Sequence, residues 1–213
     1  MAAYDLEEQE QLAELKLWWK RYGNLVVLTL SAVLVLFAAW TAWKVWEHKQ
    51  AQEASAAYSD LQKAARENDA KMANQIAGTI LEQFPRTTYA PLAALVAAKV
   101  NFESGDLKGA KVQIQWVVSN ARDGELQDIA RLRLSGILLD EKAYDEALKF
   151  LDTKPSAHLD PLFASARGDV LLAQGKTAEA QGAFKAAQDK TPAKQVAARE
   201  LLQLKIDSTG VVQ

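Results

Sequence analysis

The feature that most constrains this chain is an uncharged stretch from Tyr22 to Trp43, which reads YGNLVVLTLSAVLVLFAAWTAW. Lys20 and Arg21 come directly before it, and Lys44 comes directly after it. With a helical rise of about 1.5 Å per residue, a helix of this length crosses roughly the 30 Å hydrocarbon core of a bilayer. The stretch therefore predicts a transmembrane helix, and the chain is expected to work at a membrane.

Tryptophan residues frame this stretch on both sides. Tryptophan rings favour the headgroup level of a bilayer, because the ring body is apolar while the indole N–H stays hydrated. Three of the tryptophans, Trp40, Trp43 and Trp46, are spaced three residues apart, which also places them on one face of a helix. We expect five of the six tryptophans to lie at the membrane interface: Trp18, Trp19, Trp40, Trp43 and Trp46.

A cleaved signal peptide and a buried core helix are the two alternatives. The apolar part of a signal peptide is usually about 7–15 residues long and follows a short basic segment. Here the apolar run is longer, and the segment before it is rich in acidic residues. A helix that packs on the core of a globular domain usually carries a polar stripe on its other face, whereas this stretch is apolar all round. The membrane anchor is the favoured interpretation.

Basic residues near the anchor bear on its orientation. Lys16, Lys20 and Arg21 precede it, and Lys44 and Lys49 follow it. Lys and Arg concentrate on the cytoplasmic side of membrane proteins, so this small excess favours a cytoplasmic N-terminus. The predicted organisation is a short cytoplasmic tail (residues 1–21), a transmembrane helix (residues 22–46) and a domain outside the inner membrane (residues 47–213).

The composition of the domain excludes several classes of function. Basic and acidic residues are equally frequent after the span, so neither nucleic acid nor an anionic lipid surface is expected as its partner. The chain has no cysteine, and neither His48 nor His158 has a second ligand at metal-binding spacing. We expect no metal and no cofactor.

Catalytic patterns are also missing from the sequence. It contains no HExxH motif, no phosphate-binding glycine loop and no set of residues suited to nucleophilic catalysis. The acidic pairs Asp140–Glu141 and Asp145–Glu146 are interpreted as surface charge around a helix turn. We expect that the protein is not an enzyme.

The domain is predicted to be all-helical, with a degenerate repeat. Alanine is abundant, and the prolines fall at apparent boundaries: Pro85, Pro91, Pro155, Pro161 and Pro192. The clearest unit runs from Pro161 to Pro192 and resembles the tetratricopeptide repeat (TPR) consensus at Gly168, Leu171, Gly175, Ala180, Phe184 and Ala187. Small residues at Gly168 and Ala180 would let two antiparallel helices approach closely, with Leu171 and Phe184 filling the space beside them.

Three further units are weaker. One, at about 128–153, has Leu134, Ser135, Leu138, Tyr144, Ala147 and Leu151 at matching positions. Another, at about 91–118, has Gly105, Leu107, Ala110 and Ile114, while polar Asn101 stands where a large apolar residue is usual and is expected to weaken the array. The most divergent unit uses Ala64, Ala73, Ala77, Ile80 and Pro85. The unusually wide spacing between Ala110 and Ala147 is assigned to an enlarged loop at Ser119–Gly124.

The predicted fold class is therefore all-α, with a single N-terminal transmembrane helix followed by a TPR-like helical-repeat (α-solenoid) domain. An irregular helical bundle is the alternative. In TPR arrays the first helices of the repeats line a concave groove in which peptides or partner helices bind. On this register the partner-binding groove includes Leu92, Leu95, Lys99, Phe102, Leu132, Arg133, Leu139 and Leu172. Each leucine taken singly could instead belong to the core between repeats, and the segment Gln195–Gln213 could fill the groove.

Five segments, in this order, resemble the YfgM family of bacterial inner-membrane proteins. They are WWKRYG (Trp18–Gly23), WKVW (Trp43–Trp46), QAQEASAAYSDLQKA (Gln50–Ala64), YAPLAAL (Tyr89–Leu95) and ARGDVLLAQGKTAEAQGAF (Ala166–Phe184). The resemblance implies an ancillary component of the SecYEG translocon. It also implies a periplasmic TPR-like domain that meets nascent secretory chains and pairs with the membrane-anchored chaperone PpiD, and a cytoplasmic tail that restrains the response regulator RcsB.

Two functional hypotheses follow. The first is a scaffold beside the translocon that docks a PpiD-like periplasmic chaperone or apolar segments of secreted proteins. The second is a regulatory tether whose tail holds an RcsB-like regulator in the cytoplasm. Leu6, Leu12, Ala13, Leu15 and Trp19 recur in that tail at roughly helical spacing, which fits either a partner-binding helix or one that lies along the membrane.

Overall fold

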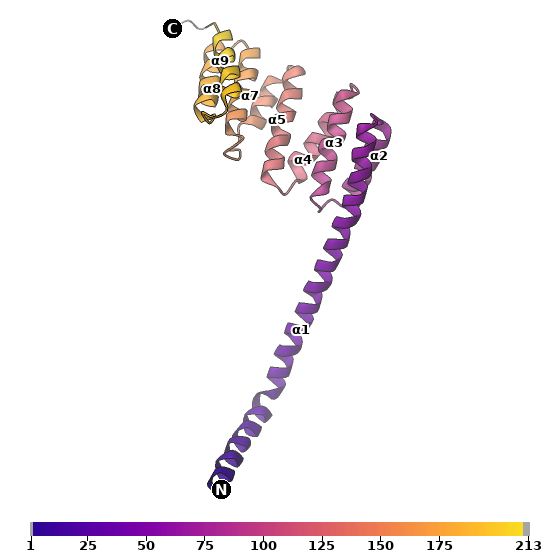
Figure 1. Cartoon of the computed structure of the whole chain (residues 1–213), viewed down its shortest axis with the longest axis vertical. Coiled ribbons are helices and arrows are strands. Elements are labelled where there is room, and N and C mark those ends of the chain that lie inside the picture. The colour runs from indigo at the N-terminus through magenta and orange to yellow at the C-terminus, as the bar shows by residue number, and fades with distance from the viewer. Residues whose placement is uncertain (1, 211–213) are drawn as a thin grey trace. The chain divides into compact units, whose positions relative to one another are not determined.

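The computed structural model describes the backbone of residues 2–210 and the side chains of residues 11–210. Over this part of the chain every regular element is an α-helix, so the all-α prediction is confirmed (Figure 1). The helices are α1 (Ala2–Arg66), α2 (Ala70–Gln83), α3 (Tyr89–Glu103), α4 (Leu107–Asn120), α5 (Gly124–Asp140), α6 (Tyr144–Leu151), α7 (Asp160–Ala173), α8 (Thr177–Lys190) and α9 (Val196–Ser208).

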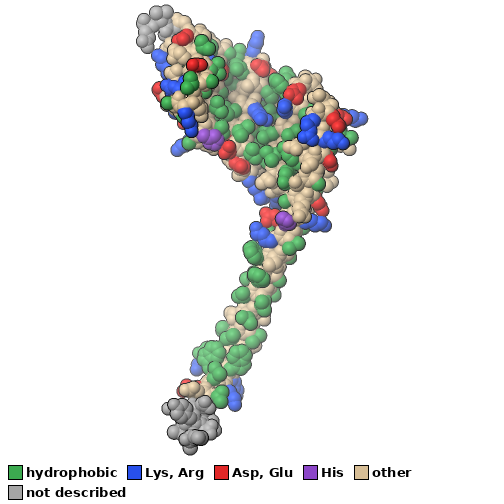
Figure 2. Space-filling view, in the orientation of Figure 1, with side chains coloured by type: hydrophobic (Ala, Val, Ile, Leu, Met, Phe, Trp, Pro, Cys, Tyr) green, Lys and Arg blue, Asp and Glu red, His purple; other side chains and the backbone are tan. Residues whose placement is uncertain are grey.

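The chain divides into two units, Met1–Gln50 and Ala51–Gln213. The described part of the first unit is α1 alone, and its apolar side chains are left uncovered by the rest of the chain (Figure 2). Leu28 is 71% exposed and Leu36 is 70% exposed, which excludes a buried core helix. Within the described residues, α1 is the one helix long and apolar enough to cross a membrane.

The second unit is a row of helix pairs. It begins with residues 51–66 of α1, which pack their side chains against α2, and continues with the pairs α3–α4, α5–α6 and α7–α8. From α2 to α9, each helix packs against the next along the chain (Figure 1). The pairs correspond to the four predicted repeat units.

Small residues hold the two helices of each pair close together. Ala73, Ala110, Ala147 and Ala180 occupy equivalent positions on the second helices, and all four are fully buried. In the last pair, Gly168 on α7 lies directly under the ring of Phe184 on α8. A close fit of this kind stabilises a helix pair through dispersion contacts and excluded water.

The turn inside each pair uses one residue with left-handed backbone geometry. Gly105 and Gly175 have φ angles of 85° and 77°, and their helices end there as expected for glycine after a helix C-terminus. Asn68 and Lys142 take the same place in the other two pairs, with φ angles of 57° and 61°. The repeat is therefore more regular in its backbone than in its sequence.

The expectation of an enlarged loop is wrong. Half of the segment Ser119–Gly124 is helical, since only residues 121–123 separate α4 from α5. The additional residues lie in α5, which has 17 residues against 14 in α7. Asn101, the polar residue at a usually apolar repeat position, is only 3% exposed, and its side-chain oxygen accepts a hydrogen bond from the Asn74 amide on α2.

Candidate partner-binding groove

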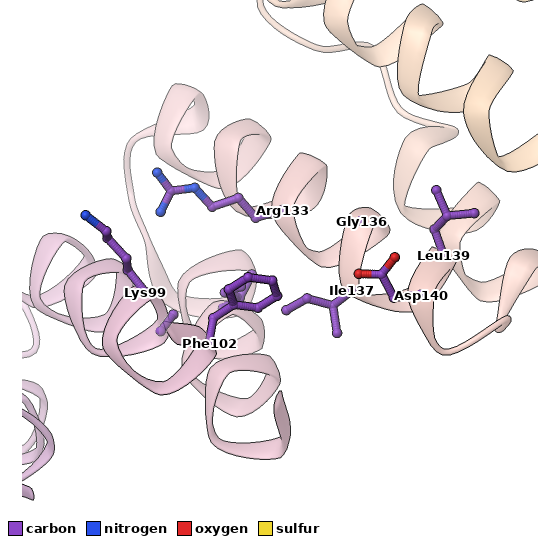
Figure 3. A pocket seen from close by; sticks show the side chains of 9 residues that line it. Lys99, Phe102, Arg133, Gly136, Ile137, Leu139 and Asp140 are labelled. Carbon is purple, nitrogen blue, oxygen red and sulfur yellow. The ribbon is translucent and has the colours of Figure 1, made fainter. Parts of the chain in front are cut away.

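A cleft of about 410 Å³ opens between the first helices of the second and third pairs (Figure 3). It is lined by Ala98, Lys99 and Phe102 from α3, Ile114 from α4, and Arg133, Gly136, Ile137, Leu139 and Asp140 from α5. Most of the lining is apolar. We name these nine residues the α3–α5 cleft.

The packing of the first helices explains where the cleft lies. The first helices of the third and fourth pairs, α5 and α7, pack directly against each other. The corresponding space between α3 and α5, the first helices of the second and third pairs, holds the cleft instead. Ile114 of α4 lies at the cleft and is only 4% exposed. Gly136 contributes no side chain, and the space where a Cβ would stand is open to 4 Å. The cleft is therefore an opening left within the array by the spacing of its helices.

A pair of apolar side chains marks the centre of the cleft. Phe102 extends from α3 and Ile137 from α5, and Figure 3 shows the two side chains pointing toward one another. Phe102 is 51% exposed, although a phenyl ring of this kind is stabilised by burial. About half of the surface of this residue is therefore available to a partner.

Charged side chains lie at both ends of this apolar centre. Lys99 and Arg133 lie on one side of it and Asp140 on the other (Figure 3). The Lys99 Nζ is 3.7 Å from Glu103 Oε1, and both side chains are well exposed, so this ion pair contributes little. Neither Arg133 nor Asp140 makes a side-chain hydrogen bond or an ion pair with another described residue.

The predicted groove residues separate into three groups. Lys99, Phe102, Arg133 and Leu139 line the α3–α5 cleft. Leu95 is buried in the core beneath it, and Leu132 packs against that same core. Leu92 lines a second, smaller cleft beside the loops at residues 85–88 and 120–123. Leu172 packs against the cluster formed by α7, α8 and α9, away from the α3–α5 cleft.

Sequence reasoning missed five lining residues: Ala98, Ile114, Gly136, Ile137 and Asp140. The available signal was Gly136, because a glycine inside a helix often marks a place that needs space. Asp140 was interpreted as surface charge. It is indeed exposed, but it lies at the end of the cleft.

The described part of the C-terminal segment does not fill the cleft. Leu202 and Ile206 of α9 are buried against Leu171 and Phe184. Lys205 Nζ donates to both carboxylate oxygens of Asp169 on α7, at 2.7 Å each. The contacts of α9 are thus made at α7 and α8.

The five anchor tryptophans are all about half exposed, from 48% to 57%. The ring centroids of Trp43 and Trp46 are 5.4 Å apart, and those of Phe37 and Trp40 are 6.0 Å apart, with the rings tilted in both pairs. At the other end of the span, the Trp19 ring lies along Gly23, where a Cβ would be 3.1 Å from it. These exposed rings suit the headgroup level of a bilayer.

Stacked helix pairs, an exposed apolar helix and an open apolar cleft define a membrane-anchored, TPR-like repeat protein. The family model for the tetratricopeptide repeat-like domain matches residues 16–211. A protein of Neisseria gonorrhoeae called "Ancillary SecYEG translocon subunit" is 34% identical over 209 residues, covering 98% of this chain and 99% of the relative.

Proteins of the same name in two other bacteria are also similar. That of Haemophilus influenzae is 29% identical and covers 87% of this chain and 91% of its own length. That of Escherichia coli is 26% identical and covers 96% of this chain and 97% of its own length. The chain belongs to this family, the TPR-like ancillary SecYEG translocon subunits (YfgM), and the resemblance seen in the sequence is confirmed. No solved structure matches the chain.

Proposed function

We propose that this protein is a scaffold, anchored in the bacterial inner membrane at the SecYEG translocon, that docks a partner protein in the α3–α5 cleft. The observation that carries the proposal is the half-exposed Phe102 at the centre of an open apolar cleft. The partner is a PpiD-like periplasmic chaperone or a nascent secretory chain handled with it. Relatives called ancillary translocon subunits support the location beside SecYEG.

The topology belongs to the same proposal. Residues 1–21 lie in the cytoplasm, residues 22–46 cross the inner membrane, and residues 47–213 form the periplasmic domain. The uncovered apolar surface of α1 supports the span, and the excess of basic residues before it supports the orientation. The domain acts by binding rather than by catalysis, which fits its family of translocon subunits and its apolar cleft.

A substitution at Phe102 tests the docking role. Full-length tagged protein would be purified from membranes in mild detergent, as wild type, as Phe102→Ser and as Val112→Ser. Val112 is 62% exposed on α4 and does not line the cleft, so it is a matched control for loss of a surface apolar side chain.

We expect Phe102→Ser to lose the co-purifying chaperone while Val112→Ser retains it. Translocon subunits remain with both variants if the anchor carries that contact. Retention of the chaperone by Phe102→Ser at wild-type level would exclude docking in this cleft.

The regulatory tether remains the second candidate. Its supporting observation is that α1 is helical from Ala2 onward, so the tail presents exposed Leu12, Leu15 and Trp19 along a helix. The Leu6 side chain lies outside the described residues. Deleting residues 2–14 is expected to release an RcsB-like regulator and raise envelope-stress signalling; unchanged signalling would contradict the tether.

A further inference from the structure

We infer that the α3–α5 cleft selects a peptide segment by the order of its charges. The segment carries an acidic residue at the Lys99–Arg133 end, an apolar residue at the centre and a basic residue at the Asp140 end. This inference rests on the proposed docking function and states which class of peptide the cleft accepts.

The three parts of the cleft follow one another along α5. Arg133, Ile137 and Asp140 are spaced by four and three residues, which puts them on one face of a helix. Figure 3 shows Ile137 between the basic and the acidic side chain. From Arg133 to Asp140 the rise is about 10 Å, or two helical turns. A bound segment of two turns therefore meets a basic group, an apolar surface and an acidic group in succession.

The acidic end of the cleft is electrostatically unbalanced. The helix α5 ends at Asp140 and has no basic residue in its last turn. A helix C-terminus carries partial negative charge, so carboxylates there add to it rather than oppose it. The neighbouring Glu141 is already paired with Lys111 at 2.7 Å, whereas Asp140 has no such pairing within the described chain. A basic side chain from a partner would neutralise this end.

The opposite end offers the complementary charge. The Arg133 guanidinium makes no ion pair with the described residues, and the planar group suits a two-pronged bond to a carboxylate. Lys99 holds Glu103 only loosely, at 3.7 Å. An acidic side chain of a partner would therefore gain two cations here.

The centre accepts an apolar side chain. Phe102 and Ile137 point toward one another, and Gly136 leaves open space beside them. The cleft volume of about 410 Å³ exceeds one side chain, which is consistent with a segment of two turns. Apolar contact supplies the affinity, and the two charged ends supply the order in which the segment binds.

Two peptides of identical composition test this inference. Both are labelled amphipathic helices with one central leucine; the first has Glu one turn before it and Lys one turn after it, and the second has these residues exchanged. Their affinity for the full-length protein in nanodiscs is measured by fluorescence anisotropy. We expect about a tenfold difference between them, and the stronger peptide reports the direction in which the segment lies.

A charge exchange in the protein provides the matched variant. In Arg133→Asp with Asp140→Arg, the preference between the two peptides should reverse, and in Asp140→Asn it should shrink. Circular dichroism checks that both variants keep their helical content. Because both residues are exposed, neither change is expected to unfold the domain.

Equal binding of the two peptides, or a preference that does not reverse, would overturn the inference. If Phe102→Ser then still removes the co-purified chaperone, the proposed docking function stands without it. Binding of neither peptide also overturns it, and the Phe102→Ser result again decides the docking function separately. A stable dimer that neither peptide dissociates would show that a second copy occupies the cleft, which contradicts the inference.

Discussion

The ring of Phe184 lies directly on the backbone of Gly168, so the two helices of the α7–α8 pair touch where one of them has no side chain. Phe184 is fully buried in this position. Its ring also faces Lys205 of α9, whose Nζ lies 5.4 Å from the ring centroid. Phe184 therefore joins α7, α8 and α9 at the C-terminal end of the helix array.

A methyl group at Gly168 therefore cannot be accommodated without moving the phenyl ring. We expect Gly168→Ala to lower the free energy of unfolding by about 1–3 kcal/mol through overpacking. Gly182→Ala on α8 is the control, because no atom lies within 4 Å of its Cβ position. That change should raise stability by about 0.5–1 kcal/mol, since alanine is the better helix former. Urea unfolding of the full-length chain would measure both, and equal effects would contradict the close contact.

The turns within the pairs show how much of the fold the sequence could predict. Gly105 and Gly175 mark two of them because glycine reaches the left-handed region without strain. Asn68 and Lys142 mark the other two, and lysine gives no sequence signal for this geometry. The pairing of helices at these turns is set by the packing of alanine faces on both sides, which overrides the local preference of the turn residue.

Lys142→Gly is accordingly expected to stabilise the protein. A residue with a Cβ in the left-handed region costs roughly 1 kcal/mol, and glycine removes that strain. The gain should be below 1 kcal/mol, because glycine also loses more entropy on folding. Gly105→Lys makes the opposite change in an equivalent turn and should destabilise. Thermal unfolding of both variants checks the sign, and a loss of stability in Lys142→Gly would contradict the strain.

The functional surface was harder to predict than the fold. The repeat register identified Lys99, Phe102, Arg133 and Leu139, which line the cleft. It also selected Leu95 and Leu172, which lie in or against cores. A small rotation of a helix decides between groove and core, and that rotation depends on packing with two neighbouring helices rather than on spacing in the sequence.

Asn101 illustrates a polar residue whose role needed the structure. Its buried side-chain oxygen accepts a hydrogen bond from Asn74, which links α3 to α2. We expect Asn74→Ala to cost about 1–3 kcal/mol, because it leaves a buried acceptor without a donor. Asn101→Ala should cost less in the Asn74→Ala protein than in the wild type, with a coupling energy of about 0.5–1.5 kcal/mol. A double-mutant cycle in urea measures this, and strictly additive losses would argue against the bond.

Asp128 is a second buried polar residue, and it stabilises the long loop between α6 and α7. Its carboxylate accepts hydrogen bonds from the backbone N–H of Ser156 at 2.9 Å, from the Ser156 hydroxyl at 3.2 Å and from Arg131 at 2.8 Å. We expect Asp128→Ala to cost about 1.5–3 kcal/mol, as for hydrogen bonds to a charged group. Hydrogen exchange should rise first in residues 152–159.

A matched control for Asp128 comes from the same loop. Asp152 pairs with Arg167 at 3.1 Å, but its side chain is 78% exposed. Asp152→Ala should therefore change stability by less than about 0.5 kcal/mol. Comparable losses in the two variants would show that burial of the Asp128 carboxylate is not what stabilises the loop.

The last prediction concerns the ends of the anchor. If Trp18, Trp19, Trp43 and Trp46 lie at headgroup level, a lipid brominated close to its headgroup should quench their fluorescence more strongly than a lipid brominated near its chain terminus. Single-tryptophan variants in nanodiscs separate the two ends. A variant that keeps only Trp116, which packs against the cores of the repeat unit, is the control and should be quenched by neither lipid. If the lipid brominated near its acyl-chain terminus quenched the tryptophans at either end of the anchor more strongly, that end of the anchor would lie inside the bilayer, which would contradict the assigned span.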